Sequence, residues 1–220
     1  MIALLVSRIL GKGRHIELPI HCTHGYLPSQ RDSWHHCRDF PSTISHKGSL
    51  VIVTDASPWG IGGVLMQDDW PVAWFADDIT THDLRRFRAK LGDSALTTLW
   101  EVLALLVAMR TWSPLLTREP CISVKADSLS ALRVAIKFSS KDRRINAIAR
   151  ELALDSSAFS HQLRIFRHIP GFSNFLPDCL SRLTAPHGSS QPFPEELSMV
   201  ARGSVAIRDF KFWKTWSPPS

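Results

Sequence analysis

Four acidic residues, each at one end of a different predicted element, are the residues of this chain best suited to chemistry. Asp55 and Asp127 each end a short apolar run, Glu101 is the only acidic residue of a long apolar stretch, and Asp178 lies in the first turn of a short predicted helix. A carboxylate is costly to bury alone, whereas divalent cations with oxygen ligands neutralise several together. Carboxylates that hold such cations are typical of phosphoryl chemistry, so the pattern indicates hydrolysis of a nucleic acid.

Each acid also has a simpler interpretation when it is taken alone. Asp55 and Asp127 are explained as turn-initiating residues, Glu101 as the rim of an amphipathic helix, and Asp178 as a charge that stabilises a helix start. If the strands that end at Asp55 and Asp127 are parallel neighbours, the two carboxylates lie about 5 Å apart. Such a pair repels unless a cation bridges it.

The elements that would position these acids lie between about residues 47 and 185. Five strands are predicted from β-branched and apolar residues, at Leu50–Asp55, Ile61–Gln67, Pro71–Phe75, Cys121–Asp127 and Gln162–His168. Four helices are predicted at about 94–112, Leu129–Phe138, about 141–157 and 174–183, the last one capped by Asn174. Short turns join the first three strands into an antiparallel meander, and a helical connection makes the fourth strand parallel to the first. This order predicts an α/β fold with a five-stranded mixed sheet flanked by helices.

The two ends of the chain are less regular than this middle zone. Residues 1–46 show no clear period, and residues 186–220 are rich in Pro and Ser, so we expect a tail that is partly disordered or docked on a partner. Cys22, His24, His36 and Cys37 in the first zone could frame a zinc site, although their spacing matches no known zinc module.

The composition indicates an ordinary globular protein with a basic surplus. The 220 residues carry a net charge of +6, which suits an anionic partner such as nucleic acid without requiring one. The four cysteines form no CxxC pair, which fits a reducing compartment. Residues 1–10 lack a signal peptide's basic start, and no apolar run approaches the roughly 18–20 residues of a membrane span. We expect a cytoplasmic or nuclear protein that is neither secreted nor bound to a membrane.

Several blocks of the sequence resemble the ribonuclease H domain of retroelement reverse transcriptases. In chain order they are Thr54-Asp55-Ala56-Ser57, Gly60-Ile61-Gly62-Gly63-Val64, Trp100-Glu101-Val102-Leu103-Ala104, Ala126-Asp127-Ser128, His168-Ile169-Pro170-Gly171-Phe172-Ser173-Asn174 and Pro177-Asp178-Cys179-Leu180-Ser181-Arg182. The last two blocks resemble the ending seen in gypsy-like and DIRS-like retrotransposons. Singly the blocks are weak, but four acids in order at spacings of 46, 26 and 51 residues are a strong signal. The resemblance covers about Leu50 to Leu183.

The resemblance implies a fold, an activity and a metal site. The fold is that of ribonuclease H, a five-stranded mixed sheet whose first three strands are antiparallel. The activity is endonucleolytic hydrolysis of the RNA strand of an RNA–DNA hybrid. Two Mg²⁺ ions, for which Mn²⁺ can substitute, would be held by Asp55, Glu101, Asp127 and Asp178. Pro177 departs from the alanine that is usual in the family, and this could shift Asp178.

Further site residues follow from the resemblance and from the basic charges. His168 is either a catalytic proton shuttle or a structural histidine that closes its strand. Substrate contacts are expected from these residues: Ser57, Gly60, Ser128, Asn174, Lys141, Arg143 and Arg144. The three basic ones lie at a predicted helix start, where positive charge opposes the dipole, and an ordinary solvated surface explains them equally well.

The resemblance also implies a partner, the polymerase domain of a reverse transcriptase. This chain has no Y-x-D-D-type pair of aspartates, and residues 1–46 resemble at most a connection or thumb remnant. An alternative is therefore a catalytically silent hybrid-binding or connection-like module of a degenerate element. A 3′–5′ exonuclease is disfavoured because its Asp-x-Glu reads Asp55-Ala56-Ser57 here, and an integrase is disfavoured because its last acid would be a helical Glu in place of Asp178.

Overall fold

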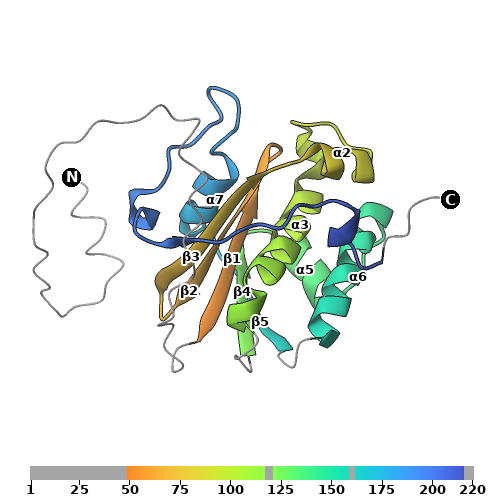
Figure 1. Ribbon diagram of the computed structural model, residues 1–220, viewed down its shortest axis with the longest axis horizontal. Coiled ribbons are helices and arrows are strands. Elements are labelled where there is room, and N and C mark those ends of the chain that lie inside the picture. The colour runs from red at the N-terminus through yellow and green to blue at the C-terminus, as the bar shows by residue number, and fades with distance from the viewer. Residues whose placement is uncertain (1–48, 117–120, 159–161, 216–220) are drawn as a thin grey trace, which may run out of the picture. The chain divides into compact units, whose positions relative to one another are not determined.

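The computed structural model describes residues 49–116, 121–158 and 162–215, which form a mixed sheet with helices on both of its faces (Figure 1). The strands are β1 (Leu50–Ala56), β2 (Gly60–Gln67), β3 (Trp70–Asp78), β4 (Cys121–Ala126), β5 (Gln162–His168) and β6 (Ala201–Arg202). The α-helices are α2 (Thr81–Phe87), α3 (Thr97–Thr111), α4 (Ser113–Leu116), α5 (Leu129–Lys137), α6 (Arg143–Ala158) and α7 (Phe175–Ser181). Single 3₁₀ turns are η1 (Ser94–Leu96), η2 (Gly171–Ser173), η3 (Glu195–Leu197) and η4 (Phe210–Phe212). The strand order across the sheet is β5-β4-β1-β2-β3-β6.

The first three strands form the antiparallel meander that the sequence predicts. β1 pairs with β2, and β2 pairs with β3, both in antiparallel fashion. Asp68 and Asp69 make the turn between β2 and β3, and both have positive φ, at 51° and 66°, as a type I′ hairpin turn requires. β3 continues to Asp78, beyond the predicted end at Phe75, because its last residues still pair with the start of β2.

The parallel pairing of β1 and β4 is also confirmed. Val51 pairs with Ser123 and Val53 with Lys125, and β5 adds to β4 in the same direction. Parallel neighbours end at the same edge of a sheet, and continuing this pairing by two residues brings Asp55 level with Asp127. The fold therefore brings together two of the four acids.

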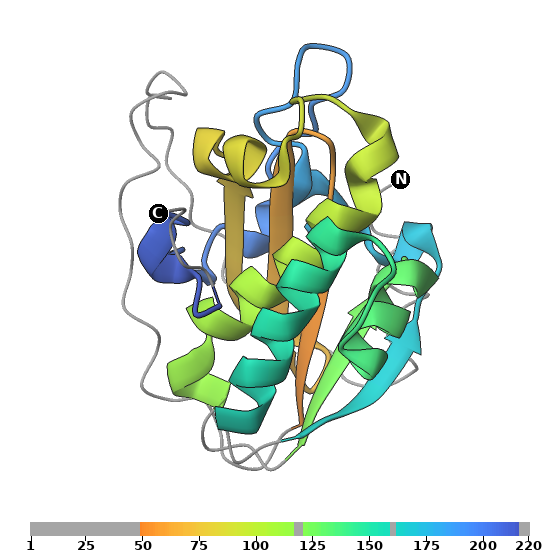
Figure 2. The ribbon, with the colours of Figure 1, turned by 90° about the vertical axis from the view of Figure 1, so that its right-hand side faces the viewer.

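Helix α3 is the centre of the main core. It packs on β1 and β2, and α5 and α6 lie beside it on the same face of the sheet (Figure 2). The sequence predicts one apolar stripe, but nearly every residue from Leu99 to Met109 is buried, as expected for a helix enclosed on all sides. Within the described residues, Ser94–Thr111 alone is long and apolar enough to cross a membrane, and 67% of it is buried in this core. Glu101 is the only acidic residue of this helix.

Helix α7 covers the opposite face of the sheet over a second, smaller core formed by Val64, Trp74 and Leu180 with their neighbours. A Cβ added at Gly62 would lie 2.6 Å from the Leu180 Cβ, so only glycine allows α7 to approach β2 this closely. Pro177 does not disrupt the helix, because the Asp178 amide still donates to the Asn174 carbonyl oxygen at 3.0 Å.

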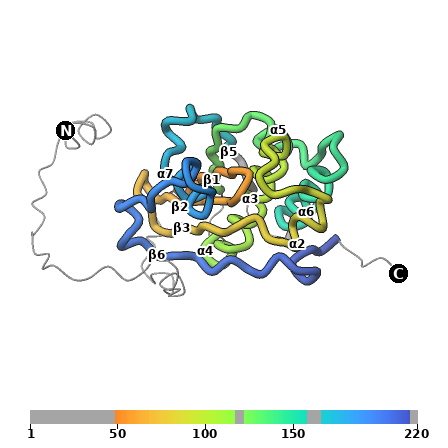
Figure 3. The backbone as a smooth tube through the Cα atoms, turned by 90° about the horizontal axis from the view of Figure 1, so that it is seen from above, coloured from red at the N-terminus to blue at the C-terminus, as the bar shows by residue number. Residues whose placement is uncertain are grey.

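The C-terminal segment, residues 186–215, differs most from the expectation. β6 pairs with β3 and gives the sheet six strands in place of the predicted five. Leu197, Phe212 and Trp213 are buried, and Figure 3 shows the segment running along the β3 edge of the sheet. Its sequence is rich in Pro and Ser, but a few widely spaced apolar residues hold it to the domain. The predicted zone 1–46 lies outside the described residues.

Candidate active site

Asp55 at the end of β1 is the most buried of the four predicted acids, with an exposed fraction of 6%. The Ser181 hydroxyl donates to its Oδ2 at 2.8 Å, and the Asn174 side-chain amide donates to its Oδ1 at 3.3 Å. Both donors are neutral and come from α7 or its N-cap. They orient the carboxylate without neutralising its charge.

The electrostatic environment of Asp55 opposes its ionisation. Burial raises the pKa of Asp55 to about 7, and the negative charges of Asp127, Asp178 and Glu101 act in the same direction, against the hydrogen bond from Ser181. Burial also raises the pKa of Glu101, with a further contribution from Asp127. The four carboxylates therefore lie within electrostatic reach of one another and repel.

Ser128 connects Glu101 on α3 to the start of α5. Its hydroxyl hydrogen-bonds to the Glu101 carboxylate and lowers the pKa of that group in part. The same oxygen accepts a hydrogen bond from the Ala131 amide at 3.2 Å and so caps α5. The residue directly after Asp127 thus holds a second acid in place. It was predicted to bind substrate, and it remains partly exposed.

His168 and Gly171 at the end of β5 border Asp127. His168 Nε2 lies 2.9 Å from the Asp127 carbonyl oxygen, and its ring is exposed. A Cβ added at Gly171 would lie 3.6 Å from Asp127 Oδ2, so the turn approaches this carboxylate closely. The contact supports a structural role for His168, and its role as a proton shuttle stays a prediction.

Asp178 is the acid that already has a cationic partner. Arg182 Nε donates to Asp178 Oδ1 at 2.7 Å, one helical turn further along α7. The Asp178 side chain is 36% exposed, so this is a surface ion pair of modest strength. Sequence reasoning missed Arg182 and Ser181 as site residues. The spacing of four from Asp178 to Arg182, which puts both on one helix face, was the available signal for Arg182.

Three of the predicted substrate-binding residues, Ser57, Gly60 and Asn174, are buried. The Ser57 hydroxyl donates to the Ser181 carbonyl oxygen at 2.6 Å, and a Cβ added at Gly60 would lie 2.8 Å from that same oxygen. Asn174 is fully buried, donates to the Thr54 carbonyl oxygen at 3.2 Å and makes no side-chain cap for α7. These contacts fix α7 to β1 and β2, and contact of the three residues with a substrate stays a prediction.

The predicted basic residues lie near the start of α6. Lys141 and Arg143 are exposed, whereas Arg144 is paired with Asp142 at 3.0 Å. Asp142 also accepts hydrogen bonds from the backbone amides of Arg144 and Ile145, and so caps α6. Contact of these residues with a substrate stays a prediction. The candidate zinc ligands Cys22, His24, His36 and Cys37 lie outside the described residues.

The four acids fit a hard divalent cation in chemistry, because carboxylate oxygens are the ligands that Mg²⁺ prefers. Asp55 adds a buried charge that has neutral hydrogen-bond donors and no ion pair within the described residues. However, in the part of the chain that the structure describes, no group of three His, Cys, Asp or Glu side chains is arranged so that it could hold a metal ion.

The topology and the placement of the acids define the class of protein. An antiparallel meander followed by parallel β4 and β5, with acids at the ends of β1 and β4, is the arrangement of the ribonuclease H-like fold. Residues 45–154, half of the chain, match the family model of the RNase H-like domain found in reverse transcriptase. The chain belongs to this family. Asp55, Glu101 and Asp127 lie within the match, while His168 and Asp178 lie beyond it.

Similar solved structures are ribonucleases H of low sequence identity. RNase H1 from the halophilic archaeon Halobacterium salinarum is 18% identical over 60% of this chain and 94% of its own, with a TM-score of 0.47. LC11-RNase H1 in complex with an RNA/DNA hybrid is 20% identical over 60% and 93%, with a TM-score of 0.45. The N-terminal RNase H domain of a Mycobacterium tuberculosis protein, solved as a fusion with maltose-binding protein, is 16% identical over 60% and 91%, with a TM-score of 0.44. No curated protein matches the sequence.

Proposed function

We propose that this domain hydrolyses the RNA strand of RNA–DNA hybrids as the ribonuclease H part of a reverse transcriptase. The observation that carries the proposal is Asp55, a buried acid with three acidic neighbours and no cation among the described residues. A structural carboxylate is normally paired when it is buried, so this arrangement is explained by cations that arrive with the substrate.

Asp55, Glu101, Asp127 and Asp178 would hold two Mg²⁺ ions, or Mn²⁺ in their place. Bound divalent cations supply an activated water and neutralise the charge that develops on the leaving oxygen. Ser181 and Asn174 fix the Asp55 carboxylate, and Ser128 fixes Glu101. Arg182 contacts only Oδ1 of Asp178, and because this pair is partly exposed, exchanging it for a metal contact would be inexpensive.

The experiment is cleavage of an end-labelled RNA–DNA hybrid by the purified full chain, with Mg²⁺, with Mn²⁺ and with EDTA. The matched control is Asp127→Asn, which keeps the shape of the side chain and removes one charge. We expect cutting of the RNA strand alone, with metal present and in the unsubstituted chain only. Equal cutting by the Asp127→Asn variant would contradict the assignment of the site.

A second candidate is a catalytically silent module that binds hybrids. Two observations favour it: the Asp178–Arg182 ion pair, and the lack of a three-residue metal site among the described residues. The same experiment separates the two. A chain that is folded by circular dichroism and binds the hybrid, yet does not cut it in either metal, supports the silent module. A polymerase domain as partner, implied by the family, belongs to both candidates.

A further inference from the structure

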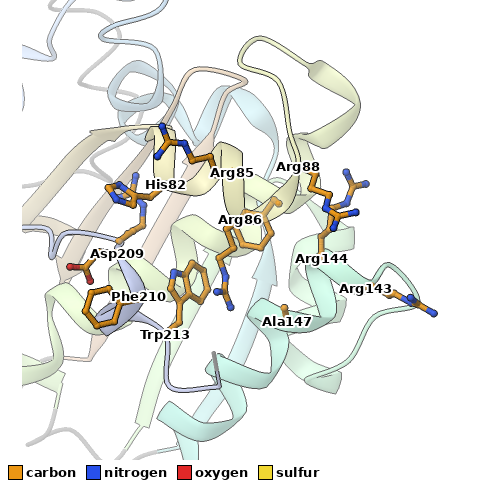
Figure 4. A pocket seen from close by; sticks show the side chains of 12 residues that line it. His82, Arg85, Arg86, Arg88, Arg143, Arg144, Ala147, Asp209, Phe210 and Trp213 are labelled. Carbon is orange, nitrogen blue, oxygen red and sulfur yellow. The ribbon is translucent and has the colours of Figure 1, made fainter. Parts of the chain in front are cut away.

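A cavity of about 680 Å³ lies apart from the acids, none of which lines it. Three elements that are distant in the sequence border it, namely α2, the start of α6 and the C-terminal segment (Figure 4). Asp209 is the only acid among its twelve lining residues, and His82 adds a further basic group. Six of the twelve are arginines: Arg85, Arg86, Arg88, Arg143, Arg144 and Arg208.

Among the residues that the structure describes, two of these arginines form ion pairs with acids. Arg208 pairs with Asp77 and Asp83, and Arg144 pairs with Asp142. Within residues 49–116, 121–158 and 162–215, the other four arginines form no ion pair. Three of those four, Arg85, Arg88 and Arg143, are exposed. The cavity therefore keeps a surplus of positive charge that can be reached from solvent.

Arg86 is the most constrained of the uncompensated arginines. Its guanidinium carbon lies 3.9 Å from the centroid of the Trp213 ring, which fixes the plane of the group. Burial lowers the pKa of Arg86, so desolvation of the charge is not fully offset by the more distant acids Glu151 and Asp83. Its buried Nε has no hydrogen-bond partner among the described residues. A guanidinium held in one plane over a tryptophan ring is suited to an anionic acceptor, because its terminal N–H donors then keep fixed directions.

We propose that Arg85, Arg86, Arg88 and Arg143, here called the arginine cleft, bind the phosphate backbone of a nucleic acid. The planar fork of donors on arginine matches the oxygens of a phosphate, and several arginines around one cavity suit successive phosphates better than a single carboxylate. The choice of an RNA–DNA hybrid as the polyanion rests on the proposed function. Binding in the cleft needs neither the four acids nor a metal.

The C-terminal segment gives this cleft a part that the family match does not contain. Trp213, which supports Arg86, and Arg208, which ties the segment to α2 through Asp83, both lie beyond residues 45–154. α2 itself starts with a capping box in which the Asp83 carboxylate accepts from the Thr80 amide at 2.9 Å. The same buried acid thus sets the start of α2 and holds the segment that completes the cleft.

The test is fluorescence anisotropy of a labelled RNA–DNA hybrid in EDTA, with every chain carrying Asp127→Asn so that no cleavage occurs. The cleft variant is Arg85→Gln/Arg88→Gln, and the matched control is Arg133→Gln/Arg150→Gln, which removes two exposed arginines outside the cleft. We expect the cleft variant to bind about tenfold more weakly, and the slope of log affinity against log salt to become shallower by roughly one to two. We expect the control to bind much as the parent does.

Arg88→Gly is a cleft variant that we expect to be as stable as the parent chain. Arg88 ends α2 in the left-handed region with φ of 49°, where glycine is the residue with least strain. Its melting temperature should therefore not fall, while its affinity for the hybrid should.

Two results would overturn the proposal. One is equal affinity of the cleft and control variants for the hybrid. The other is a cleft variant that loses binding of inorganic tripolyphosphate but keeps its affinity for the hybrid, because the cleft would then be a site for small anions. Neither result depends on catalysis, so failure of the cleft and failure of the proposed hydrolysis are told apart.

Discussion

Buried acids in this domain have two opposite electrostatic environments, one with and one without a cationic partner. Asp83, Glu151 and Asp155 are at most 1% exposed, and each is bonded to a buried or half-buried arginine, either Arg208 or Arg110. Asp55 is almost as buried, yet its neighbours are three further acids and two neutral donors. The paired acids hold the C-terminal segment to the domain, while the unpaired acid stands at the end of β1.

The difference separates the paired structural carboxylates from the carboxylate that we propose to bind cations. Glu151 has its pKa lowered by hydrogen bonds from Thr215, Arg110 and Lys214 that outweigh its burial, whereas burial dominates at Asp55 and raises the pKa. A folded chain gains nothing in stability from an acid of the second kind. We therefore expect substitutions in the two groups to change stability in opposite directions.

Loss of Arg208 should have the largest effect. Arg208→Met leaves Asp83 buried without a cation, and breaking a buried pair in this way costs about 3–5 kcal/mol of unfolding free energy. Urea denaturation at pH 7 measures it, with Arg150→Met on the exposed face of α6 as the control. A loss of stability no greater than that of the control would contradict the structural role of the buried ion pair.

Asp55→Asn should increase the stability of the metal-free chain. Without divalent cations at pH 8, removing this charge relieves burial and repulsion, so we expect the free energy of unfolding to rise by about 1–3 kcal/mol while hydrolysis is lost. Asp142→Ala is the contrasting variant, because that acid is paired with Arg144 and caps α6, and alanine removes both the charge and the cap. It should be less stable by about 1 kcal/mol. A destabilised Asp55→Asn chain would show that the two groups do not differ.

The stability of the metal-free chain should also depend on pH through Asp55. The folded chain keeps the Asp55 proton up to about pH 7, whereas the unfolded chain loses it near the ordinary value of 3.8. The folded state binds more protons between these values, so this group's contribution to the unfolding free energy falls as pH rises from about 4 to 7. Denaturation series for the parent and Asp55→Asn chains isolate the contribution. Parallel pH profiles in the two chains would contradict the shift.

Arg182→Ala should give the smallest effect. The pair with Asp178 is partly exposed, so its removal costs about 0.2–1 kcal/mol of stability. Released from Arg182, Asp178 is free to turn toward the other acids, and the Mg²⁺ concentration for half-maximal cleavage should fall by up to about fivefold. A higher Mg²⁺ requirement in this variant would instead show that Arg182 assists the site.

Much of the fold could be predicted from the sequence because its signals are local. Apolar β-branched runs mark β1 and β4, and short turns between strand patterns mark the antiparallel meander of β1, β2 and β3. The unpredicted elements depend on distant partners. α2 is only seven residues long and is held by Arg208, and β6 is a two-residue strand that exists only against β3.

The candidate site was predicted less completely than the fold, for a related reason. Acids at strand ends can be placed from the chain order alone, and the structure brings Asp55, Glu101, Asp127 and Asp178 within electrostatic reach. The roles of Ser57 and Asn174 follow from burial, which depends on how α7 packs and which no local pattern shows. Ser181, the partner of Asp55, becomes visible only once α7 is placed, whereas the four-residue spacing from Asp178 to Arg182 is a signal in the sequence itself.

Calorimetric titration of Mg²⁺, and of Mn²⁺, into the full chain at pH 8 tests the central claim most directly. The claim is that Asp55 has no cationic partner among the described residues because it binds divalent cations together with the acids around it. We expect saturable binding in the parent chain, with an accompanying rise in melting temperature, and its loss in Asp55→Asn and in Asp127→Asn. A parent chain that is folded and shows neither binding nor stabilisation with either metal would contradict the account.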